Sequence, residues 1–228
     1  MTPSQNARIP DPVVPRLSRY YRALLELESR DTRMISSEEL SRLTGYSAAQ
    51  IRKDLTYFGQ FGTPGRGYPI LELKNALLSI LGIDREWAVA VVGAGNLGQA
   101  LLGYQGFRNQ GFKVLFAFDT DRRKAGQEIN GIPVRHLSEF RGLARTHGIR
   151  MAIVTVPAQA AQDVVDELVQ AGVQAILNFA PVRIRVPENV TVHSIDMAIE
   201  LERLSCMAKN GHTKDAKAHA QTHNTAII

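Results

Sequence analysis

A glycine-rich turn placed directly after an apolar run limits what this chain can fold into. The run Trp87–Val92 is followed by a six-residue segment and then by residues with helical spacing. That segment consists of Gly93, Ala94, Gly95, Asn96, Leu97 and Gly98. A strand, a GxGxxG turn and a helix in this order predict a dinucleotide-binding turn. Such patterns also arise by chance, so the value of this one depends on its surroundings.

The three glycines have separate expected roles. Gly93 would allow the tight bend, Gly95 the approach of the backbone to a pyrophosphate, and Gly98 the close packing of helix against strand. The amides at the N-terminus of the following helix would then meet the phosphates.

A second apolar run, Lys113–Phe118, ends at Asp119, which lies 21 residues after Gly98. A carboxylate at this spacing can accept hydrogen bonds from the hydroxyls of the adenosine ribose. It would repel a 2′-phosphate, which favours NAD(H). Arg122 and Arg123 nearby keep NADP(H) open.

Strands and helices alternate after Asp119. We expect a helix from Asp121, a strand around Pro133 and Val134, a helix over 138–147 and a strand over 151–156. This alternation predicts a Rossmann-type, doubly wound parallel sheet with ligands at the carboxyl ends of its strands. Val156, Pro157 and Ala158 would lie beside a nicotinamide, although Pro157 also suits the start of a helix.

Composition narrows the class of protein. The chain has 228 residues, 44% of them hydrophobic and 21% charged, which is ordinary for a globular protein of two small domains. No apolar stretch approaches the roughly 18 residues of a membrane span and no signal peptide is evident, so we expect a cytoplasmic location. The single cysteine excludes an internal disulfide, and we expect no metal site.

The first eighty residues predict a helix-turn-helix. Apolar residues recur at helical spacing in 15–29, and Ser36 with Glu39 forms a capping box for a second helix that ends near Gly45. Ser47 with Gln50 opens a third helix. A basic N-terminal segment, with 12 Lys and Arg against 9 Asp and Glu in residues 1–85, is consistent with nucleic-acid binding. A solvated basic surface is equally consistent with this charge.

The outward face of the third helix suits the major groove of DNA. It would present Ala49, Arg52, Lys53, Thr56 and Tyr57. Gln50 is placed to reach a base edge, and Arg52 and Lys53 bases or phosphates. The segment Gly59–Tyr68 reads as a glycine-rich hairpin, a wing whose Arg66 can enter a minor groove. The alternative is a small helical bundle with a polar exterior.

We therefore divide the chain into a winged-helix domain over 1–82, which ends with a helix over 70–81, and a Rossmann domain over 83–195. An amphipathic helix over 196–207 and a disordered tail over 208–228 follow. The Rossmann segment offers no convincing general acid or base, because His136, His147 and His193 all suit structural positions.

The chain resembles the Rex family of redox-sensing transcriptional repressors from about Pro15 to Leu204. Five stretches carry the resemblance: SAAQIRKDLTYFGQFG, VVGAGNLGQALLGY, GFKVLFAFD, TVPAQAAQ and ILNFAPV. Members of this family are homodimers that repress genes by binding palindromic operators and release the DNA when NADH binds.

The resemblance implies roles for individual residues. It assigns the recognition helix to Ser47–Phe58, the pyrophosphate loop to Gly93–Gly98 and the ribose ligand to Asp119. The C-terminal helix beginning at Asp196 would cross into the partner subunit. There Asp196 would exchange partners between Arg16 and Tyr104, and Met197 would approach the nicotinamide.

Three functions remain open from the sequence. The leading hypothesis is an NADH-responsive repressor with NAD+ as the competing ligand, no small-molecule substrate and no membrane partner. A small NAD-dependent oxidoreductase with a helical dimerisation domain is the second. A coenzyme A-binding module of the ligase type is the third, and Asp119 argues against it.

Overall fold

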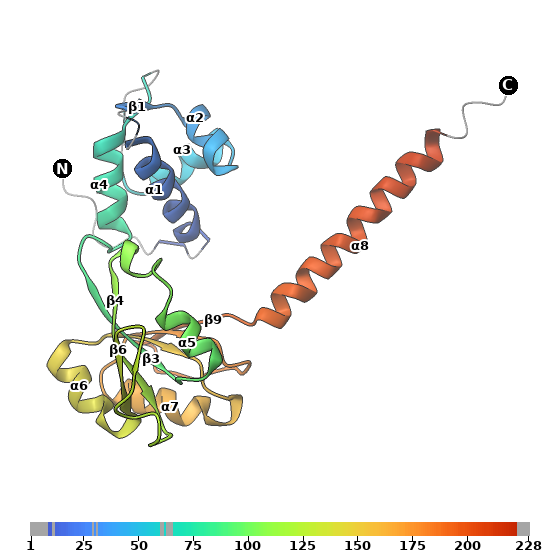
Figure 1. Ribbon diagram of the computed structural model, residues 1–228. Helices are drawn as coiled ribbons and strands as arrows, with labels where there is room; N and C mark the ends of the chain where they lie inside the picture. Colours follow the sequence, from blue (N-terminus) through green and yellow to red (C-terminus); the bar gives the residue numbers. More distant parts are fainter. Residues whose placement is uncertain are drawn as a thin grey trace. The chain divides into compact units, whose positions relative to one another are not determined.

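The computed structural model of the protein describes residues 9–10, 12–28, 30, 32–59, 62 and 66–222. The chain forms two compact units, Met1–Glu86 and Trp87–Ile228 (Figure 1). Each unit is built around its own hydrophobic core.

The N-terminal unit is a small helical domain with a two-stranded sheet. Its elements are α1 (Val14–Glu28), β1 (Met34–Ile35), α2 (Ser37–Thr44), α3 (Ala48–Thr56), β2 (Tyr68–Pro69) and α4 (Ile70–Ile80). Every helix contributes to one core, whose buried members include Leu17, Tyr20, Leu24, Leu40, Ile51, Leu55, Leu73 and Leu77. The predicted helix-turn-helix is therefore present as α2 and α3.

The predicted caps of α2 and α3 are confirmed. Ser36 accepts from the amide of Glu39 and the Glu39 carboxylate accepts from the amide of Ser36, which completes the capping box. Gly45 then ends α2 with a left-handed φ of 76°. The Ser47 hydroxyl caps α3 by accepting from the amide of Gln50 at 3.2 Å.

The wing segment is held at its base. Ile35 of β1 pairs antiparallel with Tyr68 of β2. Gly67 has a φ of +82°, and a side chain there would overlap the Ile35 carbonyl oxygen. The strand pairing thus joins 68–69 to 34–35, while residues 60, 61 and 63–65 of the predicted hairpin lie outside the described residues.

The C-terminal unit contains a seven-stranded sheet in the order β5-β6-β4-β3-β7-β8-β9. Its strands are β3 (Trp87–Val92), β4 (Phe112–Asp119), β5 (Glu128–Ile129), β6 (Ile132–His136), β7 (Met151–Val154), β8 (Ala175–Asn178) and β9 (Thr191–Ser194). All neighbours are parallel except β5 and β6. Without the edge strand β5, this is the strand order of a Rossmann fold, as predicted.

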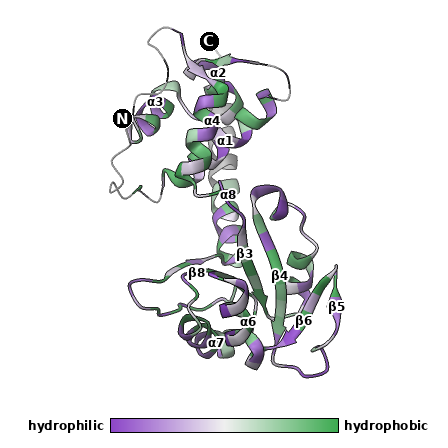
Figure 2. Ribbon diagram, turned by 90° about the vertical axis from the view of Figure 1, so that its left-hand side faces the viewer, coloured by the Kyte–Doolittle hydropathy of each residue, from purple (hydrophilic) through white to green (hydrophobic). Residues whose placement is uncertain are grey.

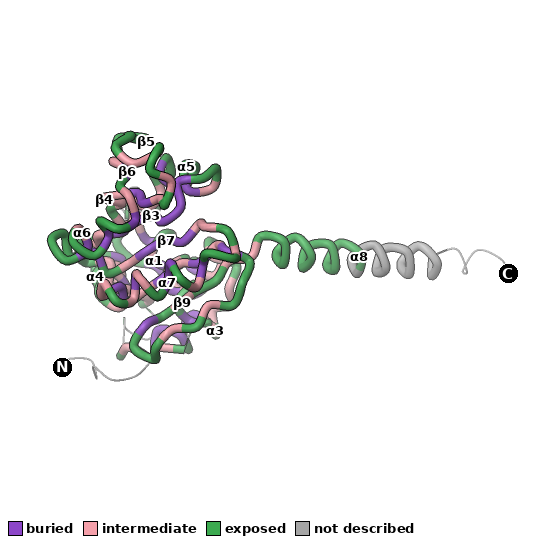
Figure 3. Tube along the Cα trace, turned by 90° about the horizontal axis from the view of Figure 1, so that it is seen from below, coloured by how far each residue is buried: buried purple, intermediate pink, exposed green. Residues whose placement is uncertain are grey.

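Helices pack on both faces of the sheet. They are α5 (Asn96–Leu102), α6 (Phe140–His147) and α7 (Ala158–Gln170), with short 3₁₀ turns at Arg108–Gln110 and Leu137–Glu139. One face packs with α6 and α7 around Phe118 and Phe140, and the other packs with α5 around Val91 and Leu102. Figure 2 shows the apolar residues concentrated along β3 and β4, and Figure 3 shows β3 and β7 buried.

The helix expected from Asp121 is wrong. The chain forms turns there and then the β5–β6 hairpin. Two features stop a helix: the Asp121 carboxylate accepts from the amide of Arg123, and Gly126 has a φ of +86°. Side chains of aspartate compete with helical hydrogen bonds in this way.

The C-terminal helix is longer than expected. The helix α8 spans Met197–Thr222, so the backbone of 208–222 is helical where the sequence predicts a disordered tail. The reason lies in its composition, since the Ala and Lys of 208–222 have high helix propensity. Residues 223–228 lie outside the described residues.

Candidate functional sites

The topology of the sheet places two loops beside each other. Strands β3 and β7 are neighbours at the point where the strand order reverses, so the loops that follow them flank one crevice. These loops are Gly93–Gly98 and Thr155–Pro157. Ligands of open α/β sheets bind at this position.

Two glycines of the first loop are required by packing. Gly93 has a φ of +102°, and a Cβ atom there would lie 2.8 Å from the Thr155 carbonyl oxygen. A Cβ atom at Gly98 would overlap the Gly93 carbonyl oxygen. The roles predicted for Gly93 and Gly98, a tight bend and a close approach of helix to strand, agree with this geometry.

Gly95 is different, because no packing constraint explains it. Its φ is −81°, which any residue adopts, and a Cβ atom there would have nothing within 4 Å. Gly95 lines the crevice, so an added side chain would fill space that a ligand could use. The space beside Gly95 would thus let a pyrophosphate approach the backbone at the N-terminus of α5, which we call the phosphate cradle.

The crevice is a pocket of about 520 Å³. Its lining residues are Val92, Gly93, Gly95, Asp119, Thr120, Lys124, Leu137, Thr155, Val156, Pro157, Ala160 and Val164. This volume lies in the range of small-molecule and cofactor sites. The pocket therefore brings together Gly93, Gly95, Asp119, Val156 and Pro157 from the predicted site.

Asp119 is held in a fixed orientation at the end of β4. One of its oxygens accepts from the amide of Ala94 at 2.9 Å and from Lys124 at 2.8 Å, and the other accepts from the amide of Asp121 at 2.8 Å. Burial alone would raise the pKa of Asp119, but these bonds outweigh it and hold the pKa below its ordinary value. The carboxylate stays ionised and keeps acceptor capacity for a ribose hydroxyl.

Seven predicted residues are not among those that line the pocket in the described part of the chain: Ala94, Asn96, Leu97, Gly98, Tyr104, Ala158 and Met197. Ala158 begins α7 behind Pro157, whereas Tyr104 and Met197 are 59% and 56% exposed. Asn96 and Leu97 form the first turn of α5. Of the residues expected beside a nicotinamide, Val156 and Pro157 line the pocket in the described part of the chain.

Sequence reasoning missed Lys124 and Thr155. The Thr155 hydroxyl donates to the Gly93 carbonyl at 2.7 Å and so holds the glycine turn. Of the cations that follow Asp119, Lys124 lines the pocket, whereas Arg123 is bonded to Asp121. Lys124 was missed because we expected a helix from Asp121. The chain forms a turn there instead, and the turn brings Lys124 back to Asp119.

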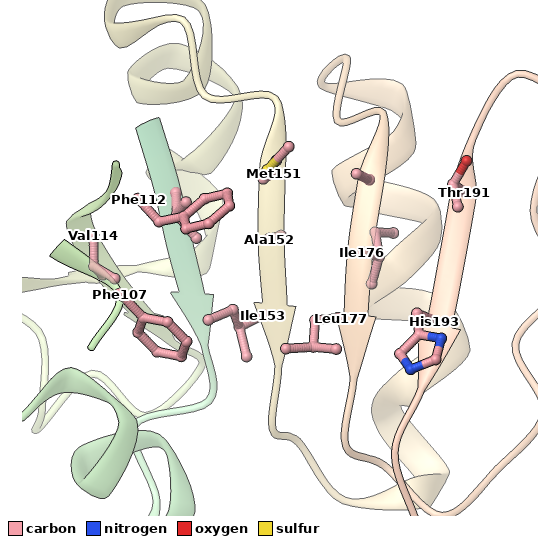
Figure 4. Close-up of a pocket in the computed structure, with 12 residues that line it drawn as sticks. Phe107, Phe112, Val114, Met151, Ala152, Ile153, Ile176, Leu177, Thr191 and His193 are labelled. Carbon is pink, nitrogen blue, oxygen red and sulfur yellow. The ribbon is translucent and has the colours of Figure 1, made fainter. Parts of the chain in front are cut away.

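None of the three candidate histidines lines this pocket. The ring nitrogens of His136 lie 2.8 Å from the Ser138 hydroxyl and 3.2 Å from the Thr120 carbonyl, and His147 packs on Phe116. His193 lies on β9 and lines a different pocket (Figure 4). Within the described residues, no cluster of His, Cys, Asp or Glu is placed to hold a metal ion.

The sheet carries a second, apolar pocket of about 290 Å³. Phe107, Phe112, Met151, Leu177 and His193 gather over β4, β7, β8 and β9 (Figure 4). It shares no lining residue with the crevice, so it is distinct from the nucleotide pocket. We call it the open sheet face.

The predicted outward face of α3 is confirmed. Ala49, Arg52, Lys53, Thr56 and Tyr57 are all exposed, and so is Arg66 at the end of the wing segment. Arg52 also donates hydrogen bonds from its Nη1 to the Ser37 hydroxyl at 2.6 Å and to the Glu38 carboxylate at 3.0 Å. Exposed cations and hydroxyls on a capped helix suit contacts with DNA bases and phosphates.

Arg16 has a partner that the sequence analysis did not foresee. Its guanidinium donates to both oxygens of the buried Asp54, at 2.6 and 2.8 Å. Tyr20 and Gln50 donate to the same carboxylate. Arg16 is thus bound within the N-terminal unit, because a buried carboxylate needs a compensating charge. These bonds use two of the five N–H groups of its guanidinium, and the expected exchange of Asp196 between Arg16 and Tyr104 stays a prediction.

Asp196 lies between β9 and α8 and caps the helix. Its carboxylate accepts from the amides of Ala198 at 2.9 Å and Ile199 at 3.4 Å. Beyond it, α8 exposes a series of large apolar side chains: Met197, Ile199, Leu201, Leu204 and Met207. All five are more than half exposed, and Figure 3 shows the described residues of α8 as exposed.

Known proteins resemble both units. Residues 8–56 match the family described as "Putative DNA-binding protein N-terminus", and residues 84–182 match the CoA binding domain. The redox-sensing transcriptional repressor Rex of Desulfitobacterium hafniense is 43% identical over 198 residues, which cover 87% of this chain and 94% of that protein. The chain belongs to the Rex family.

Solved structures of a Rex-family repressor, RSP, are similar to this chain over most of its length. Its complex with beta-NAD+ and operator DNA has a TM-score of 0.85 at 36% identity, covering 93% of this chain and 99% of that one. Its complex with beta-NADH has a TM-score of 0.81 at 34% identity, covering 92% and 99%.

Substitutions can distinguish the role of Gly95 in ligand binding from the role of Gly98 in packing. We expect Gly95→Ala to retain the fold and to weaken NADH binding at least about tenfold, because the methyl group enters the ligand's space. Gly98→Ala should instead lower the free energy of unfolding by about 1–3 kcal/mol, since it overpacks the turn. Thermal unfolding and a fluorescence titration with NADH measure both. Equal losses of stability would contradict the distinction.

Removal of one partner from the Arg16–Asp54 pair should destabilise the N-terminal unit. We expect Arg16→Met to cost about 3–5 kcal/mol, because it leaves a buried carboxylate uncompensated. The matched control is Arg22→Met, an exposed arginine on the same helix, with an effect within about 0.5 kcal/mol. Denaturant unfolding of both variants checks this.

Proposed function

We propose that the chain is a transcriptional repressor that binds palindromic operator DNA as a homodimer and releases it when NADH binds. One observation carries the proposal: a helix-turn-helix with an exposed basic face is joined to a Rossmann unit whose phosphate cradle fits a dinucleotide. Both ligands belong to the cytoplasm, and we place the activity there.

The titratable groups that line the nucleotide pocket, Asp119 and Lys124, are paired with each other. Hydride transfer requires a general acid or base near the nicotinamide to handle the proton of a substrate. Neither group suits this task, because the lowered pKa of Asp119 keeps it ionised. We therefore propose that the chain reads the redox state of the nucleotide without turning it over.

NADH carries a neutral nicotinamide ring, whereas the ring of NAD+ is positively charged. An apolar surround penalises the charged form by desolvation. Val156 and Pro157 supply part of such a surround, and we propose that Tyr104 and Met197 complete it in the dimer. NADH would then bind more tightly than NAD+.

The homodimer would bury the exposed apolar side chains of α8. Met197, Leu201 and Leu204 are 56%, 67% and 59% exposed. Contiguous exposed apolar surface of this kind marks an interaction site. We propose that α8 crosses into a second copy of the chain, and that the open sheet face is covered in the same assembly.

Coenzyme A is a second candidate ligand, because the match to the CoA binding domain covers residues 84–182. Asp119 favours the dinucleotide, since its free acceptor capacity suits the unsubstituted hydroxyls of an adenosine ribose. The 3′-phosphate of coenzyme A would lie against this carboxylate and be repelled.

We expect the full chain to bind palindromic operator duplexes with an affinity that falls as salt rises. Addition of NADH should lower that affinity by at least about tenfold, with a weaker effect of NAD+. Fluorescence anisotropy of labelled duplexes measures both. The same titrations with NADPH and with coenzyme A show whether a phosphate on the adenosine ribose prevents the effect.

Two results would contradict the proposed function. One is an operator affinity that no nicotinamide nucleotide changes, and the other is release by coenzyme A instead of NADH. Turnover of a substrate with NADH and no salt-dependent DNA binding would favour the oxidoreductase instead.

The switch proposal involves Asp196, Tyr104 and Arg16. Arg16 is held by Asp54, but this pair uses two of the five N–H groups of its guanidinium. We propose that Asp196 of one subunit exchanges between Arg16 of its partner and Tyr104.

Substitution of Asp196 should uncouple NADH binding from DNA release. Asp196→Asn keeps a side chain that can cap α8 but removes the charge, whereas Asp196→Ala removes both. We expect both variants to bind NADH and to remain on DNA at NADH concentrations that release the wild type. Asp163→Ala, an exposed carboxylate on α7, is the control. Normal release from the Asn variant would exclude this role of the charge.

A further inference from the structure

A buried carboxylate connects α1 to the recognition helix α3. Asp54 is 0% exposed and lies on the packed side of α3 beside Ile51 and Leu55. A carboxylate of this kind cannot contact DNA itself. Its importance must lie in the groups that it holds.

Four hydrogen bonds reach Asp54. Arg16 donates to both oxygens, Tyr20 donates to one at 2.8 Å, and the amide nitrogen of Gln50 donates to the other at 2.7 Å. An ionised carboxylate has about four lone-pair sites and can only accept. The network is therefore saturated, with its negative charge balanced by Arg16.

This saturation fixes the amide of Gln50. A glutamine amide on a helix surface can rotate by half a turn and exchange its oxygen and nitrogen. Here rotation would turn the amide oxygen toward an acceptor-only carboxylate, and two acceptors facing each other inside the protein are costly. One N–H of Gln50 therefore stays on Asp54, which leaves one N–H and the carbonyl oxygen for other partners.

Gln50 lies at the edge of the exposed face of α3. It is half-buried in the first helical turn, and its neighbours Ala49 and Lys53 are exposed. Residues in the first turn of a recognition helix contact base edges in helix-turn-helix proteins. A fixed donor and acceptor at this position form one defined pattern.

The base pair that matches this pattern is A·T. In the major groove, adenine offers the N7 acceptor and the N6 amino donor, and glutamine pairs with both. We propose that Asp54 is a positioning residue that locks the Gln50 amide for reading an adenine of the operator. This inference rests on the proposed DNA-binding function.

The experiment compares base preference in four variants of the full chain. Operator duplexes with each base pair replaced in turn are titrated with the wild type, Gln50→Ala, Asp54→Asn and the double variant. We expect Gln50→Ala to reduce the preference for adenine at one position of each half-site about tenfold. Asp54→Asn, whose amide can donate or accept, should flatten the same position.

The double variant tests whether Asp54 acts through Gln50. In the Gln50→Ala background, Asp54→Asn should have no further effect at that position. The salt dependence of binding should stay unchanged in all variants, because no phosphate contact is altered. Tyr20→Phe is the matched control, since it removes a different donor to Asp54; it should lower the thermal midpoint and leave base preference intact.

A modified operator tests the contact from the DNA side. An operator with 7-deazaadenine at the sensitive position lacks the N7 acceptor. It should bind the wild type about tenfold more weakly and Gln50→Ala as well as the normal operator.

A measurement on the free protein completes the test if Asp54→Asn fails to fold. The side-chain amide of Gln50 should show a ¹⁵N order parameter close to the roughly 0.85 of a rigid backbone. A freely averaging amide overturns the inference, as does an Asp54→Asn effect that is equal at all positions or persists without Gln50. Absence of specific DNA binding by the wild type overturns the proposed function as well.

Discussion

The turn between β3 and α5 is the constraint on which the nucleotide unit depends. Its backbone segments approach more closely than any side chain would allow, because a Cβ atom at Gly98 would overlap the Gly93 carbonyl oxygen. The Thr155 hydroxyl donates to that same carbonyl, and the Asp119 carboxylate accepts from the amide of Ala94. Strands β7 and β4 thus hold the turn from both sides. The arrangement that stabilises the sheet also aims the N-terminus of α5 into the pocket, so fold and binding geometry are one feature.

The N-terminal unit depends in the same way on one buried charge. Burial alone would raise the pKa of Asp54, but hydrogen bonds from Arg16, Tyr20 and Gln50 hold it below its ordinary value. A carboxyl group whose folded pKa lies below the unfolded value of about 3.9 stabilises the fold at neutral pH. That contribution disappears as pH falls through the folded pKa. At the pH where DNA is bound, the recognition helix is therefore anchored to α1 by an ionised network.

Local patterns predicted much of this structure, and long-range partners were the part that escaped. The capping box at Ser36, the glycine turn and the alternation of strands each depend on neighbours within a few residues, and all three are confirmed. The Arg16–Asp54 pair joins residues 38 positions apart, and a local sequence pattern cannot predict a contact over that separation. The helix expected from Asp121 failed because an aspartate side chain and Gly126 favour turns, which in turn hid Lys124.

The magnitude of the proposed switch shows where its energy must come from. A shift of population from 1:99 to 99:1 requires a difference of about 5.5 kcal/mol. The exchange of one exposed ion pair, such as Asp196 between two partners, contributes only about 0.2–1 kcal/mol. Burial of a large apolar side chain contributes about 1.5–3 kcal/mol. The exposed apolar residues of α8 include Met197, Leu201 and Leu204. In the proposed dimer, a change in the burial of two or three of them between the DNA-bound and released states would supply the required energy. Asp196 would then select between the two states, and the packing of α8 would stabilise them.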